Sequence, residues 1–131
     1  MIVVDASAIV DLLLENPSEP SLVKRIGAAS ELHAPHLIDI EFLSVLRRLV
    51  ARGQLNSNAA EVARELFAQL PIERYSHIFL SDRIWALRDN LTLYDASYIA
   101  LSEVLGIPLI TSDMKLAGAP GHRATVESYA R

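Results

Sequence analysis

The sequence predicts an α/β fold in which a central, mostly parallel sheet lies between two layers of helices. Short apolar runs alternate with longer segments of helical spacing along the 131 residues, a pattern typical of parallel strands joined by helices that cover both faces of a sheet. Asp5 follows the run at 2–4, and Asp113 follows the run at 107–111. Ligands of such sheets bind at the carboxyl ends of the strands. No repeat or linker divides the chain, so residues 1–131 are predicted to form one domain.

Each element is predicted from its apolar spacing and from the residues that begin or end it. Asn16-Pro17 ends the first helix, and Ser18 or Ser21 is expected to cap the second. Gly53, Pro71 and Gly106 each end a later segment of helical spacing. The predicted elements begin with a strand at 2–4, a helix at 6–14, a second helix from Ser18 or Ser21 to about 29, and a strand at 32–34. Helices at 36–52 and 56–70 and a strand at 72–76 follow. The remaining elements are helices at 77–89 and 93–105, a strand at 107–111 and a weaker strand at 125–128.

Composition narrows the classes of function. Cysteine is absent, which excludes disulfides, thiol nucleophiles and thiolate metal sites. A net charge of −4 argues against a protein that binds nucleic acid by bulk electrostatics, but not against a nuclease with an acidic metal site. The first residues carry no signal-peptide pattern and no apolar stretch reaches the length of a membrane span, so a cytoplasmic location without a membrane partner is expected.

Four carboxylates are the strongest indication of function. Asp5 and Asp113 follow strands, while Glu41 and Asp95 lie in the first turns of two apolar helices. Gathered in one cleft, four negative charges would repel each other by several kcal/mol, roughly, at intermediate dielectric. A divalent cation would hold them together, and oxygen ligands without cysteine favour Mg²⁺ or Mn²⁺ over zinc. Such a metal suits phosphoryl chemistry.

Each acid also has a purely structural interpretation. Asp5 can cap the helix that begins at residue 6, Asp113 can cap a short helix at 114–117, and Asp95 fits a capping box with Thr92. Glu41 can be an ordinary solvated acid. Three of the acids nevertheless stand beside small or hydroxylic residues within apolar segments, in the strings Asp5-Ala6-Ser7, Asp95-Ala96-Ser97 and Thr111-Ser112-Asp113. Helix capping alone does not explain that shared pattern.

Three blocks carry a resemblance to a known family. They are Ile2-Val3-Val4-Asp5-Ala6-Ser7, Ile38-Asp39-Ile40-Glu41-Phe42-Leu43-Ser44, and Leu93-Tyr94-Asp95-Ala96-Ser97-Tyr98 running through Gly106 to Asp113. In this order and at this spacing, the chain resembles the PIN-domain ribonucleases, and among them the VapC-type toxins of bacterial VapBC toxin–antitoxin systems. The resemblance covers nearly the whole chain and implies the PIN fold, a three-layer α/β/α sandwich.

The resemblance also implies a site and partners. Its acidic quartet maps onto Asp5, Glu41, Asp95 and Asp113 as catalytic residues and ligands of Mg²⁺ or Mn²⁺. Ser7 and the hydroxyls of Thr111 and Ser112 are expected to support them. The implied activity is hydrolysis of RNA phosphodiester bonds, and the implied partners are an RNA substrate, a cognate antitoxin protein and a second copy of the chain in a homodimer. A PIN-fold RNA-processing nuclease without a toxin role, or a non-catalytic acidic binding module, remains the alternative.

Several other residues receive lower weight. Arg48 and Arg52 are candidates for contact with the RNA backbone, although a solvated helix face is the commoner role for such residues. Trp85 and Tyr98 are interpreted as core or interface aromatics. A receiver-type phosphoacceptor module is disfavoured because the only late lysine, Lys115, is badly placed. A haloacid-dehalogenase-like phosphatase would need a second acid two residues after Asp5, where this chain has Ser7.

Overall fold

A computed structural model describes residues 1–14 and 19–129 and confirms the predicted alternation of strands and helices. Its elements are β1 (Ile2–Val4), α1 (Ala6–Leu14), α2 (Pro20–Gly27), β2 (Leu32–Pro35), α3 (Leu37–Ala51), α4 (Ser57–Gln69), β3 (Ile72–Tyr75), the 3₁₀ turn η1 (Ile78–Leu80), α5 (Ser81–Ala86), α6 (Leu93–Leu105), β4 (Leu109–Thr111), α7 (Met114–Gly118) and β5 (Val126–Ser128).

The strands form one sheet in the order β3-β2-β1-β4-β5, and every pairing in it is parallel. From β1 the chain first adds β2 and β3 on one side, then returns to the other side of β1 to add β4 and β5. The strand order therefore reverses between β1 and β4. In open α/β sheets, ligands bind in the crevice outside the carboxyl ends of the strands at such a switch point.

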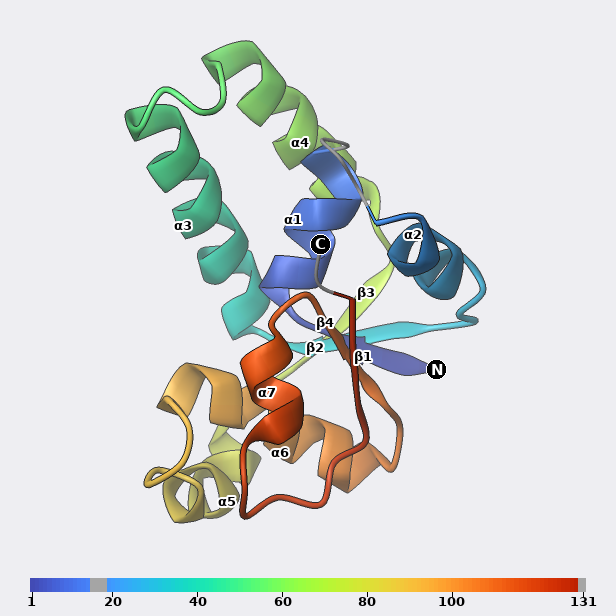
Figure 1. Ribbon diagram of the computed structural model, residues 1–131, viewed down its shortest axis with the longest axis vertical. Helices are drawn as coiled ribbons and strands as arrows, with labels where there is room; N and C mark the ends of the chain where they lie inside the picture. The colour runs from blue at the N-terminus through green and yellow to red at the C-terminus, as the bar shows by residue number, and fades with distance from the viewer. Residues whose placement is uncertain (15–18, 130–131) are drawn as a thin grey trace.

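Helices cover both faces of the sheet, which confirms the three-layer α/β/α arrangement. In Figure 1, α1, α3 and α4 lie above the strands and α5 and α6 lie below them. The central strands β1, β2 and β4 are buried along their whole length, as continuous apolar strands of a doubly covered sheet are. No helix among the described residues is long and apolar enough to cross a bilayer.

Packing on the upper face fixes the direction of α3. Ile38, Phe42 and Leu46 recur every fourth residue and are buried, as the apolar spacing predicts. The Phe42 ring stacks on Phe67 of α4 with centroids 4.2 Å apart. Because the buried stripe faces the core, the adjacent residue Glu41 lies on the flank of α3, on the side of the carboxyl ends of the central strands.

Two predicted helices differ from the observed ones. The second helix is capped by the carboxylate of Glu19, which accepts hydrogen bonds from the backbone N–H groups of residues 21 and 22, and not by Ser21. Asn16-Pro17 and Ser18 lie outside the described residues. The segment predicted as one helix at 77–89 is instead η1 followed by the short α5. Ser81 explains the break, because its hydroxyl donates to the Ile78 carbonyl at 2.7 Å and competes with regular helical bonding.

Candidate active site

Asp5 leaves β1 at its carboxyl end and turns into α1. Its Oδ1 accepts hydrogen bonds from the Ser7 hydroxyl (2.7 Å) and from the Ala8 N–H (3.0 Å), so Asp5 does cap α1 as its structural interpretation predicts. Its Oδ2 accepts a bond from the Thr111 hydroxyl (2.5 Å), which comes from the end of β4. Asp5 is 6% exposed. It therefore joins the ends of two neighbouring strands inside the molecule.

The hydroxyl residues around Asp5 form one network. Ser7 Oγ accepts the Ser112 N–H (3.0 Å), and Thr111 Oγ1 accepts the Asp113 N–H (2.9 Å). These bonds hold the turn after β4 against the turn after β1. The predicted supporting role of Ser7 and Thr111 is thus visible in their contacts. Ser112 takes part only through its backbone, because its buried hydroxyl has no hydrogen-bond partner among the described residues.

Glu41 and Asp95 approach the same place from opposite layers. The Tyr98 hydroxyl, one turn after Asp95 on α6, donates to Glu41 Oε1 at 2.5 Å. This bond connects the helix that carries Glu41 to the helix that carries Asp95. The Thr92 hydroxyl accepts the Asp95 N–H at 3.1 Å and fixes the first turn of α6. Asp113 caps α7 through Oδ1, which accepts the Lys115 N–H at 2.9 Å.

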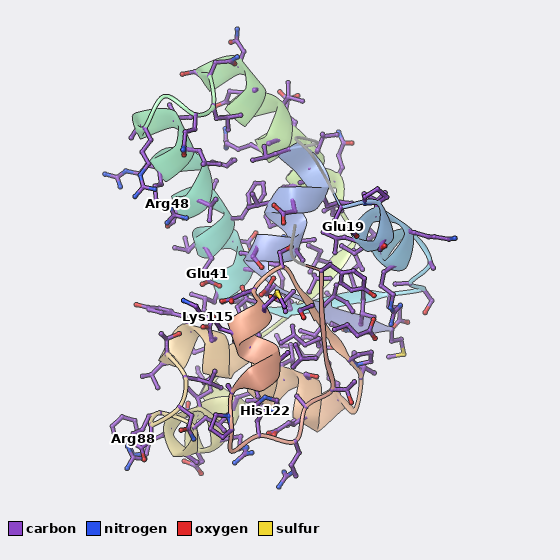
Figure 2. The ribbon with its side chains drawn as sticks, viewed as in Figure 1. Glu19, Glu41, Arg48, Arg88, Lys115 and His122 are labelled. Atoms are coloured by element: carbon purple, nitrogen blue, oxygen red, sulfur yellow. The ribbon has the colours of Figure 1, made fainter. Side chains whose placement is uncertain are left out.

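All four acids line one cavity of about 430 Å³ at the carboxyl ends of β1 and β4. Arg48 also lines it and is the only cationic side chain in that lining among the described residues. Arg52 does not line the cavity; it is exposed one turn further along the chain, as the cap of α3. Figure 2 shows Arg48 above Glu41 on α3.

Burial disfavours the charged form of three carboxyl groups in the cavity. Burial raises the pKa of Asp5 to about 6, against the lowering effect of its hydrogen bonds from Thr111, Ala8 and Ser7. Burial likewise raises the pKa of Glu41 and of Asp95, and repulsion by Asp95 and by Asp113, respectively, adds to it. Each of these acids would gain from a cation among them.

The donor set fits a divalent cation, although the acids are not drawn together around one point. Among residues 1–14 and 19–129, no three histidine or acidic side chains lie close enough to hold a metal ion as they stand. The carboxylate oxygens that line the cavity are hard ligands, which suit Mg²⁺ or Mn²⁺.

Two tyrosines of the cavity were not predicted as part of the site. Tyr98 is buried, as expected of a core aromatic, yet its hydroxyl binds Glu41. Its position three residues after Asp95, on the same helix face, was the available signal. Tyr94 lines the cavity and is exposed. Trp85 is 60% exposed, so of its two predicted roles, core or interface aromatic, only the interface role is left.

Asp39 lies close to Glu41 in sequence but belongs to a different contact. Its two carboxylate oxygens accept hydrogen bonds from the Arg74 guanidinium of β3, at 2.6 and 2.9 Å. A regular helix turns the two positions about 160° apart. Asp39 is therefore a structural partner of Arg74 and not a fifth acid of the cavity.

Comparisons with known proteins agree with this geometry. The family model of the PIN domain matches residues 2–121. Ribonuclease VapC9 of Mycobacterium tuberculosis is 44% identical over 117 residues, which are 89% of each chain. Ribonuclease VapC12 of the same organism is 37% identical over 99% of this chain and 100% of its own. The crystal structure of Mycobacterium tuberculosis VapC20, described as a toxin that cleaves the sarcin–ricin loop, superposes with a TM-score of 0.69 at 15% identity, covering 94% of this chain and 97% of its own. The chain therefore belongs to the PIN-domain family and, within it, to the VapC ribonucleases.

Proposed function

We propose that this protein is a Mg²⁺- or Mn²⁺-dependent endoribonuclease that acts as the toxin of a toxin–antitoxin pair. The observation that carries the proposal is the single cavity at the sheet's switch point, lined by the four acids Asp5, Glu41, Asp95 and Asp113. The relatives named ribonucleases support the activity, and the related toxin structure supports the role. In this proposal residues 1–131 act as one PIN domain in the cytoplasm.

The four carboxylates would hold the metal. Asp5 is the central ligand because it is the most enclosed and touches both strand ends, with Glu41 and Asp95 as further ligands and Asp113 as the outermost. Tyr98 occupies Oε1 of Glu41, which leaves Oε2 to face a ligand. A divalent ion held by these acids would supply an activated water for attack on the phosphodiester and would neutralise charge on the phosphate.

The remaining polar groups prepare the acids and receive the RNA. Ser7 and Thr111 orient the Asp5 carboxylate, and Ser112 supports them through its backbone N–H, which donates to Ser7 Oγ. Arg48, on the cavity wall, can pair with an RNA phosphate beside the acids. Arg52 is one turn further away and can meet only a more distant phosphate. Water would be the nucleophile, so the RNA 2′-hydroxyl need not react, and the resemblance to PIN-domain ribonucleases implies products with a 5′-phosphate and a 3′-hydroxyl.

The proposed protein partners fit the surface near the cavity. Ile40 of α3 is exposed and lines the cavity, and Leu43 is an exposed apolar residue one turn further along α3. An amphipathic helix of an antitoxin can cover such a surface, while a basic side chain of the same segment enters the acid cavity and replaces the metal. A homodimer of the toxin, bridged by two antitoxins, completes the proposed assembly.

RNA cleavage tests the proposed activity. The pure protein is incubated with total RNA in Mg²⁺ and in EDTA, beside the Asp95→Asn variant as a folded control. We expect cleavage by the wild type in Mg²⁺ alone, with 5′-phosphate ends on the products. Cleavage that persists in EDTA, or products with cyclic phosphate ends, would contradict metal-activated hydrolysis. A folded wild type that cuts no RNA in Mg²⁺ would support a non-catalytic acidic module.

A further inference from the structure

The start of α3 is held differently from the starts of two other helices at the acid cavity. α6 and α7 begin at the side-chain caps Thr92 and Asp113. α3 begins at His36, which makes no side-chain capping bond within the described part of the chain. Glu41 lies about one turn after this start. The turn that leads to Glu41 therefore depends on other contacts for its position.

Arg74 of β3 makes such a contact with the first turn of α3. Its Nε and Nη2 donate to the two carboxylate oxygens of Asp39, at 2.6 and 2.9 Å. Its Nη1 donates to the Ile72 carbonyl at 3.0 Å, and the guanidinium carbon lies 5.6 Å from the centroid of the Phe67 ring. All three guanidinium nitrogens are thus engaged. Paired bonds of this geometry restrict rotation as well as distance.

The Asp39–Arg74 ion pair differs from an ordinary surface ion pair. Arg64 and Glu61 pair within α4, and the Arg64 side chain is 53% exposed, whereas that of Arg74 is 26% exposed. Exposed pairs within one helix contribute little to stability. The Asp39–Arg74 pair is more enclosed and connects β3 to α3, while the same guanidinium lies over a ring of α4. It therefore fixes three elements relative to one another.

These contacts lie at the base of a helical hairpin. Figure 1 shows α3 and α4 as a hairpin that projects from the sheet. Arg74 contacts Asp39 in the first turn of α3 and Phe67 in the last turn of α4. Phe67 in turn stacks on Phe42, the residue after Glu41. A contact at the base determines the direction in which the whole hairpin leaves the sheet.

Asp39 and Glu41 lie on opposite flanks of α3, about 160° apart at 100° per residue. Arg74 holds one flank, and the Tyr98 hydroxyl donates to Glu41 on the other. Apolar packing between the flanks is non-directional, so the two polar contacts determine the rotation of the helix. Side-chain tips lie about 5–6 Å from a helix axis, so a rotation of about 10° moves one by roughly 1 Å. A displacement of that size can slow catalysis about a hundredfold.

We propose that Asp39 and Arg74 form a positioning pair that sets the rotation of α3 and thereby places the Glu41 carboxylate for metal binding. The inference rests on the proposed metal-dependent function and adds to it two residues outside the lining of the acid cavity. Asp39 and Arg74 act through Glu41 and touch neither metal nor RNA.

Mn²⁺ binding without RNA tests the pair, because positioning and long-range electrostatics predict effects of opposite sign. Arg74→Gln removes a positive charge, which by itself would tighten the binding of a cation. Loss of position should instead weaken Mn²⁺ binding about tenfold. The matched control is Arg25→Gln. Arg25 pairs with Glu127 at 2.9 and 3.3 Å and joins α2 to β5, neither of which carries an acid of the cavity. This control should bind Mn²⁺ within about twofold of the wild type.

Two further variants separate positioning from a general loss of structure. Arg74→Lys keeps the charge and the alkyl stem but cannot form the paired bonds, so it should weaken Mn²⁺ binding at least about threefold; it decides the matter if Arg74→Gln does not fold. Adding Arg74→Gln to Glu41→Gln should change Mn²⁺ affinity less than about twofold, because the pair acts through Glu41. In RNA cleavage, Arg74→Gln should lower kcat and change KM less than about threefold.

Mn²⁺ binding by folded Arg74→Gln that equals or exceeds that of the wild type would overturn the inference. Equal losses in Arg74→Gln and Arg25→Gln would do the same, as would an undiminished effect of Arg74→Gln in the Glu41→Gln background. If the wild type binds Mn²⁺ and cuts RNA in any of these cases, the positioning pair is wrong and the nuclease function stands. A wild type that neither binds Mn²⁺ nor cuts RNA counts against the function itself, and the pair fails with it.

Discussion

Asp5 occupies the least favourable environment for a charge within the acid cavity. It is buried at the junction of β1 and β4, with Asp95 near enough to add repulsion. Three hydrogen bonds offset part of that penalty, but burial still raises the pKa of Asp5 to about 6. In the metal-free protein the folded state therefore binds a proton more readily than the unfolded state does. A strained carboxylate of this kind is typical of a functional site.

The Asp5→Asn variant should lose hydrolysis and gain stability at neutral pH. Because the folded pKa exceeds the unfolded one, the free energy of unfolding of the wild type falls as pH rises from about 4 to about 6. The difference in stability between the two proteins should therefore change by on the order of 3 kcal/mol between pH 4 and pH 7. Denaturant unfolding of both proteins at pH 4, 5, 6 and 7 in a chelator measures it. Parallel pH curves for the two proteins would contradict the account, as would wild-type cleavage by the variant.

Tyr98 is a positioning residue, since its hydroxyl reaches the site only through Glu41. Tyr98→Phe keeps the ring in the core but leaves Glu41 Oε1 without its donor. We expect cleavage to fall about tenfold or more and Mn²⁺ to bind more weakly, by analogy with the loss of groups that orient metal ligands. Cleavage kinetics and Mn²⁺ titration measure these effects.

Tyr75→Phe provides the matched control for Tyr98→Phe. The Tyr75 hydroxyl meets His33 Nδ1 at 2.8 Å, away from the acid cavity, so the same atom is removed outside the site. Both variants should lose about 1 kcal/mol of stability through one hydrogen bond. Equal cleavage rates in the two variants would show that Tyr98 acts only in packing.

At the scale of the elements, sequence reasoning succeeded where local signals decide the structure. The helix at 6–14 and the helix at 93–105 have the predicted bounds, because their apolar runs and end signals are adjacent in sequence. The strand expected at 107–111 begins at Leu109 instead, where pairing with β1 starts. The helix predicted at 77–89 failed because Ser81 competes for a backbone carbonyl, which apolar spacing does not reveal.

The residues of the site likewise divide into those that local sequence signals predict and those that they do not. Asp5, Asp95 and Asp113 were predictable because each stands at a strand end or a helix start, and such positions converge in a parallel sheet. The bond between Glu41 and Tyr98 joins residues 57 positions apart, so no spacing could indicate it. Trp85 was predicted to be a core or interface aromatic, and the short α5 exposes it, which rules out the core. That the four acids serve as metal ligands stays a prediction.

Variants of two helix caps test whether the N-terminal cap of α6 positions Asp95 for catalysis. Thr92→Ala removes the hydroxyl that accepts the Asp95 N–H, and Asn56→Ala removes the equivalent bond to the Ala59 N–H at the start of α4. Each should cost about 1 kcal/mol. Only Thr92→Ala should slow RNA cleavage, because α6 carries Asp95 whereas α4 carries no acid of the cavity. Equal activity in the two variants, at equal loss in Tm, would contradict a role for the cap in positioning Asp95.

At the scale of the whole molecule, the order of the strands brings the acids together. β1 lies in the middle of the sheet and β4 returns to its free side, so the turns after both strands open into one crevice. Helices from both layers then contribute Glu41 and Asp95 to that crevice. This arrangement combines an acidic centre with exposed apolar helices beside it, which is the combination that an antitoxin could cover.

Expression in bacteria tests the toxin role. Production of the wild-type chain alone should arrest growth, and co-expression of the protein encoded next to it should relieve the arrest. Asp5→Asn, made to the same level, should leave growth normal because the proposed central metal ligand is lost. Growth curves and viable counts measure the effect. Normal growth with soluble, metal-replete wild type would favour an RNA-processing nuclease without a toxin role.

Metal binding by the folded protein tests the central claim most directly. Thermal melting is compared in EDTA and in millimolar Mg²⁺ or Mn²⁺ for the wild type, for Asp5→Asn, and for Asp82→Asn, which removes the same charge from an exposed position on α5. At a metal concentration near one hundred times the dissociation constant, the wild type and Asp82→Asn should each gain about 2.7 kcal/mol. Asp5→Asn should gain little. Melting curves of the wild type that coincide with and without metal, or an equal gain in Asp5→Asn, would contradict a metal site built on the four acids.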